Sequence, residues 1–238
     1  MNRLLKISAI FVFLIIIAVF GASSVQAADP QFLVSWKADT SVPPSYAGKS
    51  LPVSGSTITV SFELIGVAGN QVGKILDLTN NNVRWYVNGN LLSQGNNEKT
   101  FSFITTDNND TETDVKISAE YADPVAGYSY FVDKYITIPL SHPQVVINQN
   151  GMSSSVAIGT GTKLFALPYF FNTLMKNLSI QWSADGQDIP IDPKDPWNLN
   201  VNIGSNYISG AQVTISAIVQ NILDSSMQAQ KSVIITVQ

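Results

Sequence analysis

Trp85-Tyr86-Val87-Asn88-Gly89 and Trp182-Ser183-Ala184-Asp185-Gly186 share one pattern, a tryptophan in an alternating run that ends in Asn-Gly or Asp-Gly. Asn-Gly or Asp-Gly beside such a run is the strongest short-range signal for a two-residue β-hairpin. Both stretches therefore predict a strand that ends in a tight turn. Their recurrence indicates a repeated unit.

The spacing after each tryptophan extends the match between the two halves. Trp85 precedes Phe101 by 16 residues, and Trp182 precedes Leu199 by 17. The positions expected to match further on are Val115 to Ala119 with Val213 to Ala217, and Lys134 with Lys231 near the start of a closing strand. Such regular intervals predict two copies of one domain in tandem.

Short alternating runs fill the chain after its N-terminal segment and predict an all-β protein. The clearest runs are Phe32 to Trp36, Ile58 to Leu64, Val83 to Val87, Phe101 to Phe103, Val115 to Tyr121 and Ile136 to Leu140. Alternation of this kind places one face of each strand on a core and the other in water.

The expected domains are residues 28–141 and 142–238, divided at Ser141-His142-Pro143 because a proline cannot extend the preceding strand. So short a linker predicts limited swing between them. The segment from Gly66 to Asn82 is longer than its counterpart in the second half, and it predicts an extra strand or an extended loop.

Residues 1–27 have the order of a secretory signal peptide: Arg3 and Lys6, an apolar run from Ile7 to Phe20, and small and polar residues ending at Ala27. The alternative is an uncleaved membrane anchor, although the run is shorter than the ~20 residues needed to span a bilayer. Either way the chain is expected to be exported, and to be extracellular, at the cell surface or periplasmic.

Charge and cysteine content exclude several partners and chemistries. The chain has 13 basic and 17 acidic residues; without Arg3 and Lys6 the counts are 11 and 17, a net charge of −6. Nucleic acid and anionic membranes are therefore disfavoured, and membrane contact is expected only through residues 1–27 if they are uncleaved. With no cysteine, the chain has no disulfide, thiolate metal site or cysteine nucleophile.

The tryptophan on the third strand, the turn after it and about seven short strands per domain resemble the immunoglobulin-like sandwich. The stretch from Leu178 to Gly186 is similar to bacterial surface variants of that fold, including PKD-type domains. The resemblance implies two tandem immunoglobulin-like antiparallel β-sandwiches after the signal peptide, in a cell-surface protein.

Catalytic groups are scarce. The single histidine, His142, lies in the linker, so no multi-histidine metal site is expected and a Ser-His-Asp triad is disfavoured. Trp36, Trp85 and Trp182 lie in apolar alternation and are expected to be structural core. We therefore expect no enzyme and no cofactor, with a structural Ca²⁺ as the alternative.

Two acidic segments offer oxygen ligands for Ca²⁺. The first candidate set is Asp107, Asn109, Asp110 and Asp114; the second is Asp185, Asp188, Asp192 and Asp195. The favoured interpretation of the first segment is a solvated loop between two strands, since it lacks the glycine and glutamate spacing of an EF-hand, and Ca²⁺ binding is the alternative.

Aromatic side chains near turns are the remaining candidates for a contact or carbohydrate-stacking surface. They are Tyr46, Tyr128, Tyr130, Tyr169 and Trp197. The favoured interpretation for most of them is ordinary core packing, and a binding patch is the alternative.

These observations favour a non-catalytic exported module for adhesion, assembly or spacing, with a protein or glycan of the cell envelope as its partner. Two alternatives stay open: an envelope assembly factor or chaperone that uses strand donation, and a carbohydrate-binding accessory module.

Overall fold

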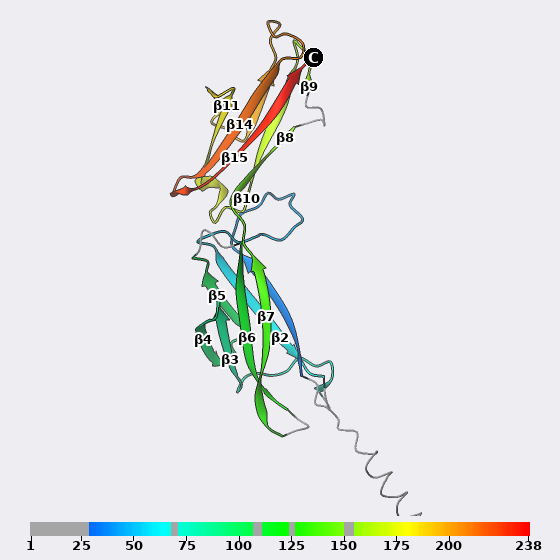
Figure 1. The fold of residues 1–238 in the computed structure, drawn as a ribbon, viewed down its shortest axis with the longest axis vertical. Coiled ribbons are helices and arrows are strands. Elements are labelled where there is room, and N and C mark those ends of the chain that lie inside the picture. The colour runs from blue at the N-terminus through cyan, green and yellow to red at the C-terminus, as the bar shows by residue number, and fades with distance from the viewer. Residues whose placement is uncertain (1–28, 68–70, 107–110, 124–126, 150–154) are drawn as a thin grey trace, which may run out of the picture.

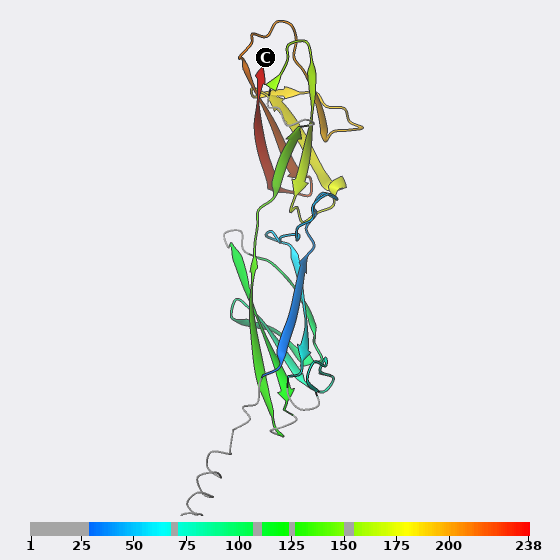
Figure 2. The same ribbon diagram turned by 90° about the vertical axis from the view of Figure 1, so that its right-hand side faces the viewer.

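The computed structural model describes residues 29–67, 71–106, 111–123, 127–149 and 155–238. The expected signal peptide, residues 1–27, lies outside them. The described chain forms two β-sandwiches arranged end to end along one long axis, with the C-terminus at the far end of the second (Figures 1 and 2).

The first sandwich contains seven antiparallel strands among the described residues. They are β1 (Gln31–Ala38), β2 (Thr57–Ile65), β3 (Asn82–Val87), β4 (Asn90–Asn96), β5 (Thr100–Ile104), β6 (Glu112–Ala122) and β7 (Ser129–Pro139). One sheet has the order β1-β2-β5 and the other β4-β3-β6-β7.

The second sandwich repeats this plan. Its strands are β8 (Gln144–Gln149), β9 (Ser155–Val156), β10 (Gly161–Tyr169), β11 (Leu178–Ala184), β12 (Gln187–Ile189), β13 (Asn198–Asn202), β14 (Gln212–Asn221) and β15 (Asp224–Val237). The sheet orders are β13-β10-β8 and β12-β11-β14-β15-β9. The short β9 pairs with β15 in parallel, whereas the other strand pairs are antiparallel.

Leaving β9 aside, the first, second and fifth strands of each copy form one sheet and the other four form its partner. This is an immunoglobulin-like arrangement. The predicted fold class of two tandem immunoglobulin-like antiparallel β-sandwiches is therefore confirmed.

The two hairpin turns have the same backbone geometry. The φ angles are 48° and 80° at Asn88 and Gly89, and 47° and 79° at Asp185 and Gly186. Positive φ at both central positions is the type I′ turn, which Asn-Gly and Asp-Gly favour because these residues tolerate it best. The turn that the sequence predicts is thus formed in both copies.

The predicted match between the sixth strands of the two copies, β6 and β14, is wrong by two residues. Trp85 lies opposite Ile117, and Trp182 lies opposite Ala217. Ile117 therefore corresponds to Ala217 instead of the expected Ile215. Because side chains alternate with a period of two, the slip leaves every residue on its expected face.

The closing strands correspond as expected at Lys134 and Lys231, which pair with Ile117 and Ala217. Both strands begin earlier than the sequence indicates, at Ser129 and Asp224. In β15 the residues before Met227 are polar and exposed, so hydrophobic alternation does not mark them, whereas in β7 Tyr130 and Val132 already face the core.

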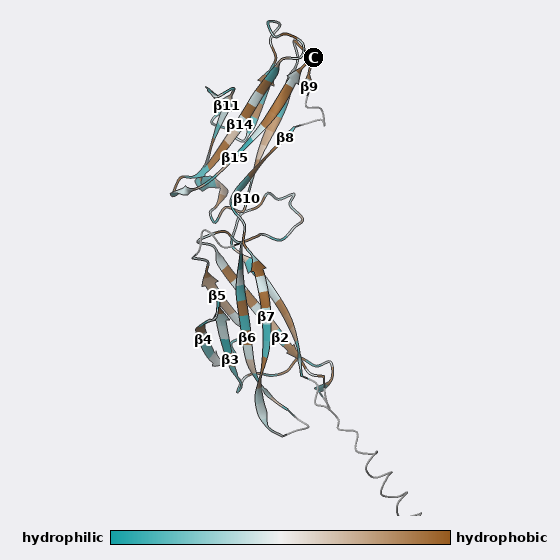
Figure 3. Cartoon of the chain, viewed as in Figure 1, coloured by the Kyte–Doolittle hydropathy of each residue, from teal (hydrophilic) through white to brown (hydrophobic). Residues whose placement is uncertain are grey.

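Apolar residues alternate with polar ones along the strands and form one core inside each sandwich (Figure 3). In the segment 66–82, the described residues form an extended loop with a single bridge between Ile65 and Ile75 and no strand of their own before β3. Leu76 and Leu78 of this loop are buried in the first core. Burial of these two leucines therefore holds the loop against the first sandwich.

Each sandwich is centred on its tryptophan. Trp85 and Trp182 are both 0% exposed. The indole Nε1 of Trp85 donates to the Glu98 carbonyl at 2.8 Å, and that of Trp182 donates to the Pro196 carbonyl at 3.0 Å. The same loop therefore satisfies the polar atom of the largest core side chain in both copies.

We expect Trp85→Ala and Trp182→Ala each to lower the free energy of unfolding by about 3–5 kcal/mol, because each empties the centre of a core. Trp85→Phe retains most of the apolar volume but leaves the Glu98 carbonyl unpaired, and should cost about 1–3 kcal/mol. Chemical denaturation followed by circular dichroism measures both losses. Tyr128→Ala, at an exposed position, is the control. Wild-type denaturation midpoints for both Trp85→Ala and Trp182→Ala would contradict the prediction.

Candidate functional site

The segment between β1 and β2, residues 39–56, reaches the second sandwich and forms the inter-domain joint. The Ser41 amide donates to the Phe171 carbonyl at 2.7 Å, and the Phe170 amide donates to the Ser41 carbonyl at 2.8 Å. The Asn172 side-chain amide also donates to the Ser54 carbonyl at 3.3 Å. Backbone pairing therefore extends across the two sandwiches.

Val53 completes the core of the second sandwich although it precedes β2 of the first. It is 1% exposed and belongs to the same cluster of buried side chains as Phe171. The first sandwich holds its backbone: Thr105 Oγ1 donates to the Val53 carbonyl at 2.6 Å, and the Val53 amide donates to Ser56 Oγ at 2.9 Å. One residue is thus anchored in one sandwich and buried in the other.

Two predicted contact aromatics, Tyr46 and Tyr169, face each other inside this joint. The ring of Tyr46 lies edge-on to those of Tyr169, at 5.5 Å, and Phe170, at 5.8 Å. Phe170 has a φ of 60°, which is costly for an aromatic residue and persists where the surroundings hold it in place. These aromatics pack within the chain.

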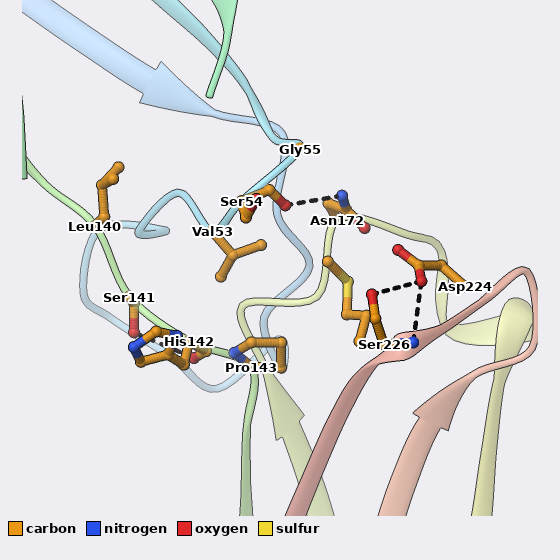
Figure 4. A pocket seen from close by; sticks show the side chains of 11 residues that line it. Val53, Ser54, Gly55, Leu140, Ser141, His142, Pro143, Asn172, Asp224 and Ser226 are labelled. Carbon is orange, nitrogen blue, oxygen red and sulfur yellow. Dashed lines mark hydrogen bonds between the residues drawn. The ribbon is translucent and has the colours of Figure 1, made fainter. Parts of the chain in front are cut away.

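A hollow of about 410 Å³ lies beside the joint. Val53, Ser54 and Gly55 line it from the first sandwich, residues 140–143 from the linker, and Asn172, Asp224, Ser226 and Met227 from the second (Figure 4). His142, the linker histidine, is one of its lining residues.

The polar groups of this hollow are used mainly to hold its own loops. Asp224 Oδ1 accepts bonds from the Ser226 amide at 3.0 Å and the Ser226 hydroxyl at 2.7 Å (Figure 4). This carboxylate therefore caps its own hairpin turn. The hollow is therefore bordered by loops that hold one another in place.

A second surface lies on the outer face of the β4-β3-β6-β7 sheet. Tyr86 lies opposite Lys116, and Lys116 lies opposite Tyr135, so the three side chains form one line across three strands; we call it the aromatic row. Tyr86 is half-buried and Tyr135 is 66% exposed. The Lys116 Nζ lies 5.2 Å from the centre of the Tyr86 ring and 5.4 Å from that of Tyr135.

The lysine of the row is held by an ion pair. Lys116 Nζ lies 2.8 Å from Asp133 Oδ2. The hydrogen bond to Asp133, followed by the one with Tyr135, raises the pKa of Lys116. Burial alone would raise the pKa of Asp133, but hydrogen bonds with Lys116 and Ser118 hold it below its ordinary value. The pair is therefore charged at neutral pH and positions the ammonium between the rings.

The row borders a hollow of about 590 Å³. The lining residues are Tyr86, Gly89, Asp114, Val115, Lys116, Tyr135, Ile136 and Thr137. A Cβ added at Gly89 would meet nothing within 4 Å, so the turn leaves its end of the hollow open.

The second sandwich carries serines where the first carries the row. Ser183 lies opposite Ser216, and Ser216 lies opposite Ser232. These positions correspond to Tyr86, Lys116 and Tyr135 because Trp182 and Lys231 pair with Ala217 as Trp85 and Lys134 pair with Ile117. The fold therefore forms without aromatic residues at these positions.

Sequence reasoning missed the aromatic row. Its members come from three strands that are separated along the chain, and only the strand register brings them together. The available signal was the contrast between Tyr86 and Ser183, which directly follow the two matched tryptophans.

The other predicted aromatic residues have different surroundings. Trp36 and Trp197 are partly buried and pack against the first and second cores. Lys49 Nζ lies 3.7 Å from the centre of the Trp36 ring. Tyr128 is 62% exposed. Its ring lies 5.8 Å from that of Tyr130, so these two gather at the end of the first sandwich, apart from the joint.

Tyr130 is half-buried and anchors the start of the described chain. Its hydroxyl donates to Asp29 Oδ1 at 3.0 Å. Burial, reinforced by this hydrogen bond, raises the pKa of Tyr130 to about 12. The ring therefore has a structural contact and a neutral hydroxyl at physiological pH.

Of the first Ca²⁺ candidate set, Asp107, Asn109 and Asp110 lie outside the described residues. The remaining member, Asp114, accepts a bond from Thr137 Oγ1 at 2.8 Å. The Ca²⁺ site stays a prediction.

In the second set, Asp185, Asp188 and Asp192 each accept a hydrogen bond from a different group: the Thr214 amide, the Gln181 side chain and the Lys194 amide. Asp195 accepts one from Asn198. Across the described ranges, no three histidine or acidic side chains are grouped to hold a metal. Within those same ranges there is also no helix of the length and hydrophobicity that a bilayer crossing requires.

No protein-family model and no curated protein matches the chain. Among solved structures, three N-terminal domains of the bacteriophage RB49 highly immunogenic outer capsid protein align with 87% of this chain, at 11% identity and a TM-score of 0.42. This chain spans 59% of that structure's length.

Fibronectin(III)-like modules of Clostridium thermocellum CbhA align with 87% of this chain and 94% of theirs, at 16% identity and a TM-score of 0.28. An ICAM-5 ectodomain fragment aligns with 87% of this chain and 53% of its own, at 11% identity and a TM-score of 0.30. The fold class rests on the strand order and register of the chain itself.

We expect Val53→Asp to unfold part of the second sandwich, because it places an unpaired carboxylate in that core. Hydrogen exchange read by mass spectrometry should show faster exchange in β10 and at Phe171. Leu33→Asp, which puts the same group on an exposed face of the first sandwich, is the matched control. Faster exchange confined to the first sandwich after Val53→Asp would contradict the joint.

The raised pKa of Tyr130 predicts a loss of stability in alkali. Between pH 10 and about 12 the unfolded chain loses this proton and the folded chain keeps it, so the free energy of unfolding falls as pH rises through that range. Tyr130→Phe should make the melting temperature less dependent on pH there. It should also remove a late step from the phenolate absorbance titration; persistence of that step would assign it to another tyrosine.

Proposed function

We propose that this chain is a non-catalytic, exported binding module in which two sandwiches present the aromatic row to a protein or glycan of the cell envelope. The proposed domains are residues 28–141 and 142–238, preceded by the signal peptide or anchor of residues 1–27. The proposal specifies a surface and leaves the partner's class open.

One observation carries this proposal, the contrast between the two copies of the sheet face. Tyr86, Lys116 and Tyr135 occupy positions where the sister sandwich has serines. Residues that the fold does not require, and that expose aromatic surface around a fixed cation, are better explained by binding than by folding.

The joint supports the same proposal. A tandem acts as a stiff spacer when contacts between its domains prevent swing about the linker. Here the buried Val53, the Tyr46 ring and the Ser41 backbone bonds oppose such a motion. A stiff tandem holds the row at a constant distance and orientation from the end of the second sandwich.

The proposal predicts that binding depends on the row and not on the rest of the fold. We define the serine-row variant as Tyr86→Ser, Lys116→Ser and Tyr135→Ser, which copies the sister residues and so should fold. Labelled chain should bind cell envelopes of its own source, and the variant should bind roughly tenfold or more weakly, as expected when central aromatic contacts are removed. Quantitative binding isotherms measure the difference.

Tyr128→Ser is the control, because it removes an exposed tyrosine outside the row. Circular dichroism and thermal melting verify that each variant is folded. Equal binding by the wild type and the folded serine-row variant would show that the row is not the binding surface.

A further inference from the structure

The aromatic row has the geometry of an open track. Neighbouring strands lie about 4.8 Å apart, so Tyr86 and Tyr135, two strands apart, present their rings at a separation of roughly 10 Å. Leu91 lies opposite Tyr86 on β4 and is 48% exposed, and both β4 and β7 are sheet edges. Together with Leu91, the row therefore crosses the whole sheet from edge to edge, perpendicular to its strands.

The aromatic row combines apolar ring faces with charged groups that can form hydrogen bonds. Two ring faces offer apolar, polarizable surface, and an ammonium lies between them. An ammonium has three hydrogens, so Lys116 can donate to a ligand hydroxyl in addition to its bonds with Asp133 and Tyr135. The Asp133 carboxylate is 37% exposed and can accept from a hydroxyl.

Charge on this face is locally balanced. Lys116 is paired with Asp133 at 2.8 Å. Arg84, in the next row, lies over the Phe131 ring at 4.1 Å and donates from Nε to Asn82 Oδ1 at 3.3 Å. The full chain has more acidic than basic residues. A polyanion would thus meet no net positive field, and a neutral ligand is favoured.

The track is narrow. On one side of it Asp114 and Thr137 bond to each other at 2.8 Å, and on the other side lie Arg84 and the buried Ser118. A stable protein partner covers about 800 Å² of each surface with an apolar centre. One line of aromatic residues with polar flanks is a better match for an unbranched chain than for a protein surface.

From these observations we propose that the aromatic row binds a neutral, unbranched polysaccharide, whose sugar rings stack on Tyr86 and Tyr135 and whose hydroxyls bond to Lys116 and Asp133. Sugars have this combination of apolar ring faces and hydroxyl edges. The inference rests on the function proposed above and adds the class of ligand.

The test uses the full chain and soluble neutral hexasaccharides from cellulose, mixed-linkage β-glucan, mannan and chitin. Isothermal titration calorimetry should detect at least one of them. Tyr86→Ser and Tyr135→Ser should each weaken binding by about threefold to tenfold, which corresponds to the loss of one aromatic contact. The serine-row variant should abolish binding, and Tyr128→Ser should leave it unchanged.

Further outcomes separate this inference from the proposed function. Row-dependent binding of envelope protein without binding of any neutral hexasaccharide would overturn the ligand class and leave the function standing. Binding of heparin or alginate in place of neutral sugars would overturn the ligand class as well. Sugar binding that is undiminished in the serine-row variant would place the ligand elsewhere and overturn the inference. Equal binding of envelopes and of sugars by the wild type and the folded serine-row variant would overturn both proposals.

Discussion

Each sandwich depends on one buried indole with a satisfied polar atom. Trp85 and Trp182 are fully buried, and each donates to a carbonyl of the loop that leads to the fifth strand. The apolar ring holds the two sheets together, and the single hydrogen bond fixes how that loop crosses the core. Side chains alternate between the two faces of a strand, so the inward direction of the tryptophan also determines which neighbouring side chains face water.

The position of the aromatic row on the outer face follows from this alternation. Tyr86 directly follows the core tryptophan and must point outward, and pairing then selects Lys116 and Tyr135 as its neighbours. Ser183 has the same relation to Trp182. Two copies of one scaffold thus differ in what they display while their interiors stay alike, which is how functional surfaces arise on a common fold.

Features set by local chemistry could be predicted from the sequence. The turns at Asn88 and Asp185 could be predicted because Asn-Gly and Asp-Gly are among the few pairs that tolerate positive φ at both positions. The burial of the two tryptophans could be predicted from the alternation of apolar and polar residues around them. The sixth-strand register was wrong by two residues because alternation cannot distinguish a slip of one full period. Contacts made across the fold left no local signal: Tyr46 and Tyr169 touch in the structure but belong to different sandwiches and lie far apart in the sequence. The aromatic row escaped prediction for the same reason.

The joint also constrains how the chain is made. During synthesis the segment with Tyr46 and Val53 emerges well before its partners Phe170 and Phe171, and the hydrogen bond between Ser54 and Asn172 spans 118 positions. Until then the apolar side chains of the segment have no core to enter. The sheets of the first sandwich pair without this segment, but its apolar side chains are covered only when the second sandwich is in place. Exchanging the second sandwich for an unrelated one would leave Val53 and Tyr46 without the side chains that cover them.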